Sequence, residues 1–217
     1  MQQSRDVGKP GNACIPQGGR SLPGAVARGS PGRLITQGQQ PSVPPTMPAT
    51  RELLFARLAD LGIETVTVEH PAVFTVAESS GLERELPGGH TKNLFLKDKG
   101  NRLFLVVALG HAHIDLKSLH KKLACDRLSF GKPELLMEVL GVPPGSVTPF
   151  AIVHDTARRV TVVLDAGMMR HERLNFHPLE NTATTNIARV DLLTFIRACG
   201  HEPHIVDVTM SDQMDRP

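Results

Sequence analysis

Two apolar segments lying close together constrain this chain more than any other feature of it. Residues 92–98 and 102–109 are both rich in Leu and Phe, the second also in Val, and only Lys99, Gly100 and Asn101 separate them. Two strand-like segments joined by three residues, one of them glycine, are typical of an antiparallel β-hairpin. The sequence therefore predicts a β-sheet that contains this hairpin.

Helical and strand patterns alternate around the hairpin without a regular βαβ rhythm. Apolar residues recur at helical spacing from Leu53 to Leu61, and Gly62 ends that helix. Further helices are predicted over 115–124, 132–140 and 190–199, a short one opens at 75–78, and strands are predicted over 64–69, 160–164, 173–177 and 204–207. This order favours an α/β (α+β) fold with a mixed, largely antiparallel central sheet and surrounding helices.

The pattern begins abruptly at Thr50. Residues 1–49 are rich in Pro and Gly, a composition that buries too little apolar surface to fold, so we expect a disordered extension. Met47 stands just before the first periodic segment, and a start assigned too far upstream would explain the extension equally well. We expect one domain over 50–208 and a flexible tail over 209–217.

Composition excludes several classes of protein. No apolar run approaches the roughly 18 residues that span a bilayer. Cys14, Cys125 and Cys199 form no metal-binding pair, which favours free thiols in a cytoplasmic protein. His111 and His113 have no third ligand at a recognisable spacing, and no nucleotide-binding or nucleophile motif occurs. We therefore expect neither a metal nor a cofactor.

Lys92 is the first candidate for chemistry. On a strand it shares a face with Leu94 and Leu96, while Asn93 and Phe95 take the other face. An ammonium held on an apolar face can be partly desolvated and point into a pocket. The alternative is a lysine at the rim of the sheet that extends to water.

A loop rich in glycine and proline is the second candidate. Residues 141–149 read GVPPGSVTP, and such a loop can offer backbone amides to a developing oxyanion. Pro143 and Pro144 have no N–H, so Gly145 and Ser146 are the expected donors. A plain turn leaving the preceding helix remains the alternative.

Two polar segments complete the set of candidates. His177 opens the run HPLENTATT at 177–185, whose short polar groups suit a substrate amine, hydroxyl or ribose, or else form a hydrogen-bonded loop and the start of a strand. Lys117, Lys121 and Lys122 lie on a predicted helix and could bind phosphate groups, although a solvated helix face is the commoner outcome. The folded part carries 19 basic and 21 acidic residues, so only local clusters can support a nucleic-acid partner.

Four motifs in order resemble one known family. They are His70-Pro71 followed by VAE at 76–78, TKNLFLKD at 91–98, GVPPGSVTP at 141–149 and HPLENT at 177–182. Together they are similar to the YbaK/prolyl-tRNA synthetase-associated domain family, over about residues 50–207. The resemblance implies a mixed α/β fold and trans-editing, in which a mischarged aminoacyl-tRNA is hydrolysed by water attack on its ester.

The resemblance also implies roles for individual residues. It makes Lys92 the key active-site residue and the loop at 141–145 a cradle for the aminoacyl carbonyl. As a mechanistic hypothesis, the amides of Gly145 and Ser146 polarise this carbonyl, and His177 orients the substrate amine, the ribose or water. Substrate contacts are expected from Asn93, Gly141, Val142, Pro144, Asn181 and Thr182.

The most similar members are free-standing proteins that remove alanine from proline tRNA. Removal of cysteine or another small amino acid is the alternative within the family, and a non-catalytic module that binds tRNA or a synthetase is the alternative outside enzymes. Val73, Phe74 and Leu94 are the expected pocket walls. The implied partners are the acceptor end of mischarged tRNA(Pro) and, among proteins, prolyl-tRNA synthetase or an elongation factor.

Overall fold

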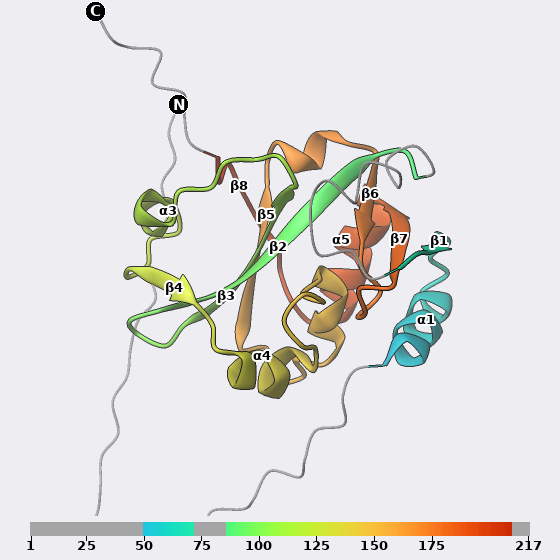
Figure 1. Ribbon diagram of the computed structural model, residues 1–217, viewed down its shortest axis with the longest axis horizontal. Helices are drawn as coiled ribbons and strands as arrows, with labels where there is room; N and C mark the ends of the chain where they lie inside the picture. Colours follow the sequence, from blue (N-terminus) through green and yellow to red (C-terminus); the bar gives the residue numbers. More distant parts are fainter. Residues whose placement is uncertain (1–49, 72–85, 210–217) are drawn as a thin grey trace, which may run out of the picture. The chain divides into compact units, whose positions relative to one another are not determined.

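An eight-stranded mixed sheet organises the chain (Figure 1). The computed structural model describes residues 50–71 and 86–209. Neighbouring strands follow the order β1-β7-β6-β2-β3-β5-β8, and β4 pairs with β2. The strands are β1 (Thr65–Glu69), β2 (Gly89–Asp98), β3 (Leu103–Leu109), β4 (Leu128–Phe130), β5 (Val160–Asp165), β6 (Arg173–Phe176), β7 (Ala183–Ala188) and β8 (His204–Val206). The helices are α1 (Arg51–Asp60), α3 (Leu116–Lys122), α4 (Pro133–Leu140), α5 (Arg189–Ala198) and the short 3₁₀ helices η2 (Pro149–Val153) and η3 (Met168–Arg170).

The predicted hairpin is confirmed by the β2–β3 pair, in which Lys92 lies opposite Ala108 and Lys97 opposite Leu103. Its turn is fastened by Asp98, whose carboxylate accepts the backbone N–H of Arg102 at 2.8 Å and the Arg102 Nε–H at 2.7 Å. Asn101 takes the left-handed conformation, with φ of 66°, that such a short connection requires. The turn therefore fixes the register of the two longest central strands.

The mixed α/β fold is confirmed, and the strand directions are more evenly divided than expected. Among the described strands, four pairs are antiparallel, namely β1–β7, β2–β3, β2–β4 and β6–β7. The pairs β2–β6, β3–β5 and β5–β8 are parallel. Strand β2 joins the two halves of the sheet, since its first residues pair with β6 and the rest pair with β3 and β4.

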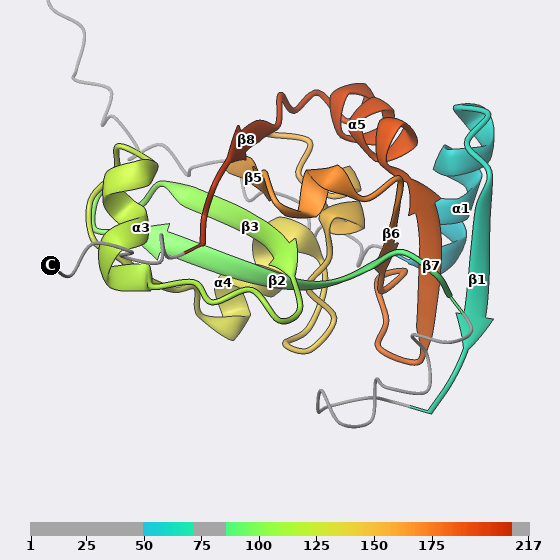
Figure 2. The same ribbon diagram turned by 90° about the horizontal axis from the view of Figure 1, so that it is seen from above.

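Apolar side chains cover both faces of the hairpin, because successive residues of a strand point to opposite sides. Leu105 and Val107 enter a large cluster that α1, α4, α5 and η2 also build. Val106 and Ala108 enter a smaller cluster that includes Leu119 of α3. Figure 2 shows α1 and β1 at one end of the sheet and α3 at the other. Both faces are thus closed by helices.

Most predicted elements are confirmed within a few residues. The helix predicted at 75–78 lies outside the described residues. Strand β4 has only three residues and was not expected, whereas β7 (ATTNIA), which lacks an apolar alternation, confirms the strand start that was the alternative interpretation of 177–185. No helix in the described part of the chain is long and apolar enough to cross a membrane.

Candidate active site

His177 follows β6 directly and is held by one hydrogen bond to the backbone. Its Nδ1 lies 3.0 Å from the carbonyl oxygen of Ala183. A carbonyl only accepts, so the proton sits on Nδ1 and Nε2 carries a lone pair. Burial lowers the pKa of His177, which keeps the ring neutral, although the Ala183 carbonyl opposes this effect. His177 is therefore a neutral imidazole with an acceptor nitrogen.

His70 lies beside His177, with ring centroids 6.2 Å apart. It follows β1, and its backbone N–H donates to the carbonyl of Thr182 at 2.9 Å. Its Nδ1 donates to the Pro71 carbonyl at 2.8 Å, and its Nε2 lies 2.9 Å from the hydroxyl of Thr184. The sequence had marked His70 only as part of a family motif. The sequence feature that could have predicted its position is the His-Pro pair directly after a predicted strand.

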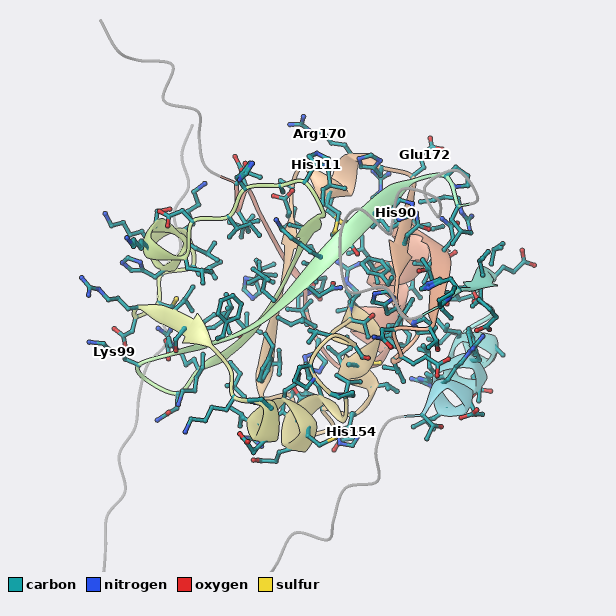
Figure 3. The ribbon with its side chains drawn as sticks, viewed as in Figure 1. His90, Lys99, His111, His154, Arg170 and Glu172 are labelled. Carbon is teal, nitrogen blue, oxygen red and sulfur yellow. The ribbon has the colours of Figure 1, made fainter. Side chains whose placement is uncertain are left out.

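Two buried asparagines hold the chain where it enters β2. The side-chain amide of Asn175 donates to the Leu86 carbonyl at 3.2 Å, and that of Asn186 donates to the Pro87 carbonyl at 2.9 Å and to Asn175 Oδ1 at 2.7 Å. His90 Nε2, labelled in Figure 3, lies 3.1 Å from the same Leu86 carbonyl and donates to it. We call these five residues the polar clamp. The polar clamp holds the start of β2 against β6 and β7. His70 holds the end of β1 against β7 in the same region.

Lys92 leaves the sheet on the face that the sequence predicted, with Leu94 and Leu96. It is half-buried, and its Nζ donates to the carbonyl of Ala112 in the turn after β3. Desolvation lowers its pKa. A partly desolvated ammonium held by a single carbonyl is ready to exchange that partner for a ligand oxygen.

Asn93 points to the opposite face from Lys92. Its Oδ1 is buried and has no hydrogen-bond partner among the described residues. Buried acceptors are normally paired, since leaving one unpaired costs about 1–3 kcal/mol. The face that Asn93 shares with Phe95 belongs to the large cluster, which also anchors the loop after α4. Asn93 Oδ1 can therefore accept a hydrogen bond that no described residue supplies.

The loop at 141–149 begins with Gly141, which ends α4 in the left-handed conformation with φ of 66°. Gly145 is exposed, has φ of 90° and is surrounded by open space. The structure differs from expectation at Ser146, whose N–H donates to the Pro143 carbonyl at 3.1 Å and closes a turn. This amide is therefore not free, and Gly145 is left as the donor of the pair.

The other residues predicted to contact the substrate differ in their exposure to solvent. Val142 is buried in the large cluster, whereas Pro144 is exposed. Asn181 is half-buried and Thr182 is exposed on the turn between β6 and β7. Val73 and Phe74 lie outside the described residues.

The residues that hydrogen bonds join near His177 are mostly ones that the sequence did not propose as site residues. Lys117, Lys121 and Lys122 are exposed on α3. No hydrogen bond or ion pair between described residues connects Lys92 with the loop or with His177. In the same part of the chain, no three His, Cys, Asp or Glu side chains are grouped to hold a metal ion.

Comparisons with known proteins agree with this arrangement. The family described as "Aminoacyl-tRNA editing domain" matches residues 70–195. The chain is 42% identical over 151 residues to "Prolyl-tRNA synthetase associated domain-containing protein 1" of Danio rerio, covering 69% of this chain and 82% of that protein. It is 34% identical over 152 residues to "Prolyl-tRNA editing protein ProX" of Acetoanaerobium sticklandii, covering 70% and 93%.

A solved structure shares the fold. The crystal structure of a proposed trans-editing enzyme for prolyl tRNA synthetase superimposes with a TM-score of 0.58 at 18% identity, covering 78% of this chain and all of that one. At this identity the likeness supports the architecture alone. With the family match and the two sequence relatives, it establishes that the chain belongs to the aminoacyl-tRNA editing domain family, a family of aminoacyl-tRNA deacylases.

Proposed function

We propose that this protein hydrolyses Ala-tRNA(Pro), cleaving the ester between alanine and the 3′-terminal adenosine. The observation that carries the proposal is the hydrogen bond from His177 Nδ1 to the Ala183 carbonyl at 3.0 Å, which leaves Nε2 as the nitrogen that can accept a proton. Family membership supports the reaction class, and the lowered pKa of His177 supports its part as a proton acceptor. An aminoacyl ester is already activated, so water needs only orientation and a stabilised oxyanion.

Each polar group has a distinct part in this mechanism. His177 Nε2 accepts a proton from the attacking water or from the ribose hydroxyl that orients it, and this proton passes to the ribose oxygen that leaves when the ester bond breaks. The orphaned Asn93 Oδ1 accepts a hydrogen bond from the α-ammonium of the amino acid. The Gly145 amide donates to the carbonyl oxygen as negative charge develops on it.

Lys92 has a positioning part. Its ammonium exchanges the Ala112 carbonyl for an oxygen of the substrate, either the carbonyl side of the ester or the terminal phosphate of the 3′-adenosine. A charged acceptor binds an ammonium more strongly than a neutral carbonyl does. Lys92 is therefore a charge-stabilising group and not a nucleophile.

Selectivity rests on size. Proline must be excluded by pocket volume, with Val73, Phe74 and Leu94 as the proposed walls. One methylene in a pocket is worth about 1–3 kcal/mol, so alanine, serine and cysteine are separated imperfectly. The exposed lysines of α3 are proposed to meet the tRNA backbone, and prolyl-tRNA synthetase or an elongation factor in the cytoplasm is the proposed protein partner.

The decisive experiment measures deacylation by the full chain of tRNA(Pro) charged with alanine, cysteine, serine or proline. Alanine should be released fastest and proline should be retained, in buffer with excess chelator, because no step requires a metal. Binding of all four without turnover would instead identify a non-catalytic module. Fastest release of cysteine would reassign the substrate within the family.

Lys92→Ala tests the site itself. Loss of one group that stabilises the oxyanion costs about 3 kcal/mol, or roughly a hundredfold in rate. Lys99→Ala is the matched control, since Lys99 is exposed in the turn at the far end of β2 (Figure 3). Equal rates for Lys92→Ala and the parent would remove Lys92 from the mechanism.

A further inference from the structure

A polar cavity whose lining includes neither His70 nor His177 lies where α1, η2 with the loop after it, and the end of α5 meet. Its volume is about 270 Å³, and its lining includes two arginines, a threonine and a thiol. The lining residues are Arg57, Ile152, Val153, Thr156, Arg158, Ala198 and Cys199. No Asp or Glu belongs to this described lining. Two guanidinium groups at one cavity without a carboxylate create a local excess of positive charge.

Arg57 is held in place by the end of α5. Its Nη2 donates to the carbonyl of Ala198 at 2.9 Å. This contact satisfies one of the free carbonyls that end α5 and places a positive charge at the negative end of the helix. A guanidinium has five N–H donors, so others remain for a ligand in the cavity.

Arg158 is placed by a local backbone arrangement that is uncommon for an arginine. Its φ is 55°, in the left-handed region, and its N–H donates to the Asp155 carbonyl at 3.0 Å. The Arg158 side chain passes over Gly200, where an added Cβ would lie only 2.6 Å from Arg158 Nε. The bare backbone of Gly200 therefore leaves the space that the guanidinium occupies.

The loop that carries Thr156 and Arg158 is held to β5 by hydrogen bonds. The buried carboxylate of Asp155 accepts the backbone N–H of Arg159 at 3.0 Å and that of Val160 at 2.8 Å. These bonds attach the loop to the first residue of β5. The donors at the cavity mouth are thus presented by a rigid support, which lowers the entropy lost when a ligand binds.

Cys199 does not make this cavity a thiol active site. Burial raises the pKa of its thiol to about 11, with Arg57 opposing the shift. At neutral pH such a thiol is protonated and is a poor nucleophile. The cavity is therefore suited to binding and not to covalent chemistry.

We propose that this cavity binds a phosphate group through the guanidinium groups of Arg57 and Arg158 and the hydroxyl of Thr156. In the described chain neither arginine forms an ion pair with a carboxylate, although Arg51, Arg102, Arg159 and Arg197 each do. The planar fork of arginine matches two phosphate oxygens at once. The threonine hydroxyl adds a donor to a third oxygen.

The test is a calorimetric titration of the full chain with inorganic phosphate at constant ionic strength, with chloride as the reference anion. Phosphate should bind saturably, and Arg158→Gln should weaken it about tenfold or more, since a charge-assisted hydrogen bond contributes about that much. Arg159→Gln is the matched control, because exposed Arg159 is the next residue and pairs with Glu138 outside the cavity. Absence of saturable binding, or equal losses in the two variants, would overturn the proposal.

Two further arms identify the source of the phosphate and protect the test from misfolding. A short RNA with a 5′ phosphate and the same RNA without it are each added as competitors of inorganic phosphate. Competition by both RNAs assigns the cavity to backbone phosphodiesters. Competition by the phosphorylated RNA alone, or by neither RNA, assigns it to phosphomonoesters or free phosphate. If Arg158→Gln lowers the melting temperature, Arg57→Gln replaces it, and unchanged phosphate affinity there contradicts the proposal. No aminoacyl-tRNA is involved, so the result is independent of the editing reaction.

Discussion

Strands β3 and β7, one in each half of the sheet, are both largely buried, but β7 buries polar side chains and β3 buries none. Strand β3 buries only apolar residues from Leu103 to Ala108. Strand β7 buries Thr184, Thr185 and Asn186 in the same way. Buried polar groups stabilise a fold only when they are paired, and their pairing has direction. We call the part of the sheet that contains β3 the apolar half and the part that contains β7 the polar half. The apolar half therefore contributes stability, whereas the polar half fixes the positions of the residues around His177.

His177→Ala should have the largest effect and should act on the rate alone. Removing a group that transfers a proton in the transition state costs about 10²–10⁴-fold, so deacylation of Ala-tRNA(Pro) should fall by that factor. Single-turnover assays measure the rate, and a thermal melt confirms folding. His204→Ala, an exposed histidine on β8, is the control and should keep the parent rate. A loss of less than tenfold in His177→Ala would contradict the division between the halves.

Leu105→Ala should act on stability alone. Leu105 is fully buried in β3, and truncating such a leucine costs about 2–5 kcal/mol through lost burial and the cavity left behind. Urea denaturation measures the free energy of unfolding, with exposed Ile205→Ala as the control, which should change it by about 0.5 kcal/mol or less. The rate per folded molecule should be unchanged. A hundredfold loss of rate in the folded fraction would show that the apolar half also shapes the site.

The sequence predicted the apolar half better than the polar half. The hairpin, β5 and the helices follow from apolar periodicity, which burial imposes directly on the chain. Strand β7 and the polar clamp leave no such pattern, because threonine and asparagine are equally common in surface turns. The pairing of Asn186 with Pro87 depends on residues 99 positions apart in sequence, which no local pattern encodes.

The candidate site shows the same limit. The sequence placed Lys92 on the correct face and singled out His177, since both stand in recognisable motifs. It did not predict that Ser146 donates its amide to Pro143, because turn geometry within a loop that contains three prolines depends on the surrounding packing. Whether Lys92 and His177 act on one substrate stays a prediction.

Asn186→Ala should have an intermediate effect on both quantities. It removes the donors to the Pro87 carbonyl and to Asn175 Oδ1, and each buried acceptor left unpaired costs about 1–3 kcal/mol. The polar clamp holds the chain where it enters β2. Asn186→Ala should therefore reduce the preference for alanine over serine by a larger factor than it reduces the rate of alanine release. The ratio of kcat/KM for the two charged tRNAs measures this, with exposed Thr194→Ala on α5 as the control. A stability loss with unchanged selectivity would make the clamp purely structural.

The smallest effect expected is a shift in pH dependence. Burial lowers the pKa of His177, so its acceptor nitrogen stays unprotonated to a lower pH than in an ordinary histidine. Between the two pKa values the unfolded chain binds the proton and the folded chain does not. Stability and the required neutral form are therefore both present at neutral pH and are lost as pH falls through the folded pKa.

A profile of kcat/KM from about pH 5 to 8 reports the pKa of the free enzyme, after subtraction of uncatalysed ester hydrolysis. The rate should be flat near neutrality and should fall on the acid side, with a midpoint below the ordinary histidine value. In His177→Gln the residual rate should lose this acid limb, because glutamine does not titrate. An acid limb with an unchanged midpoint in His177→Gln would assign the titration to another group. His70 would be the first residue to test, since its ring is adjacent and it belongs to the same polar half.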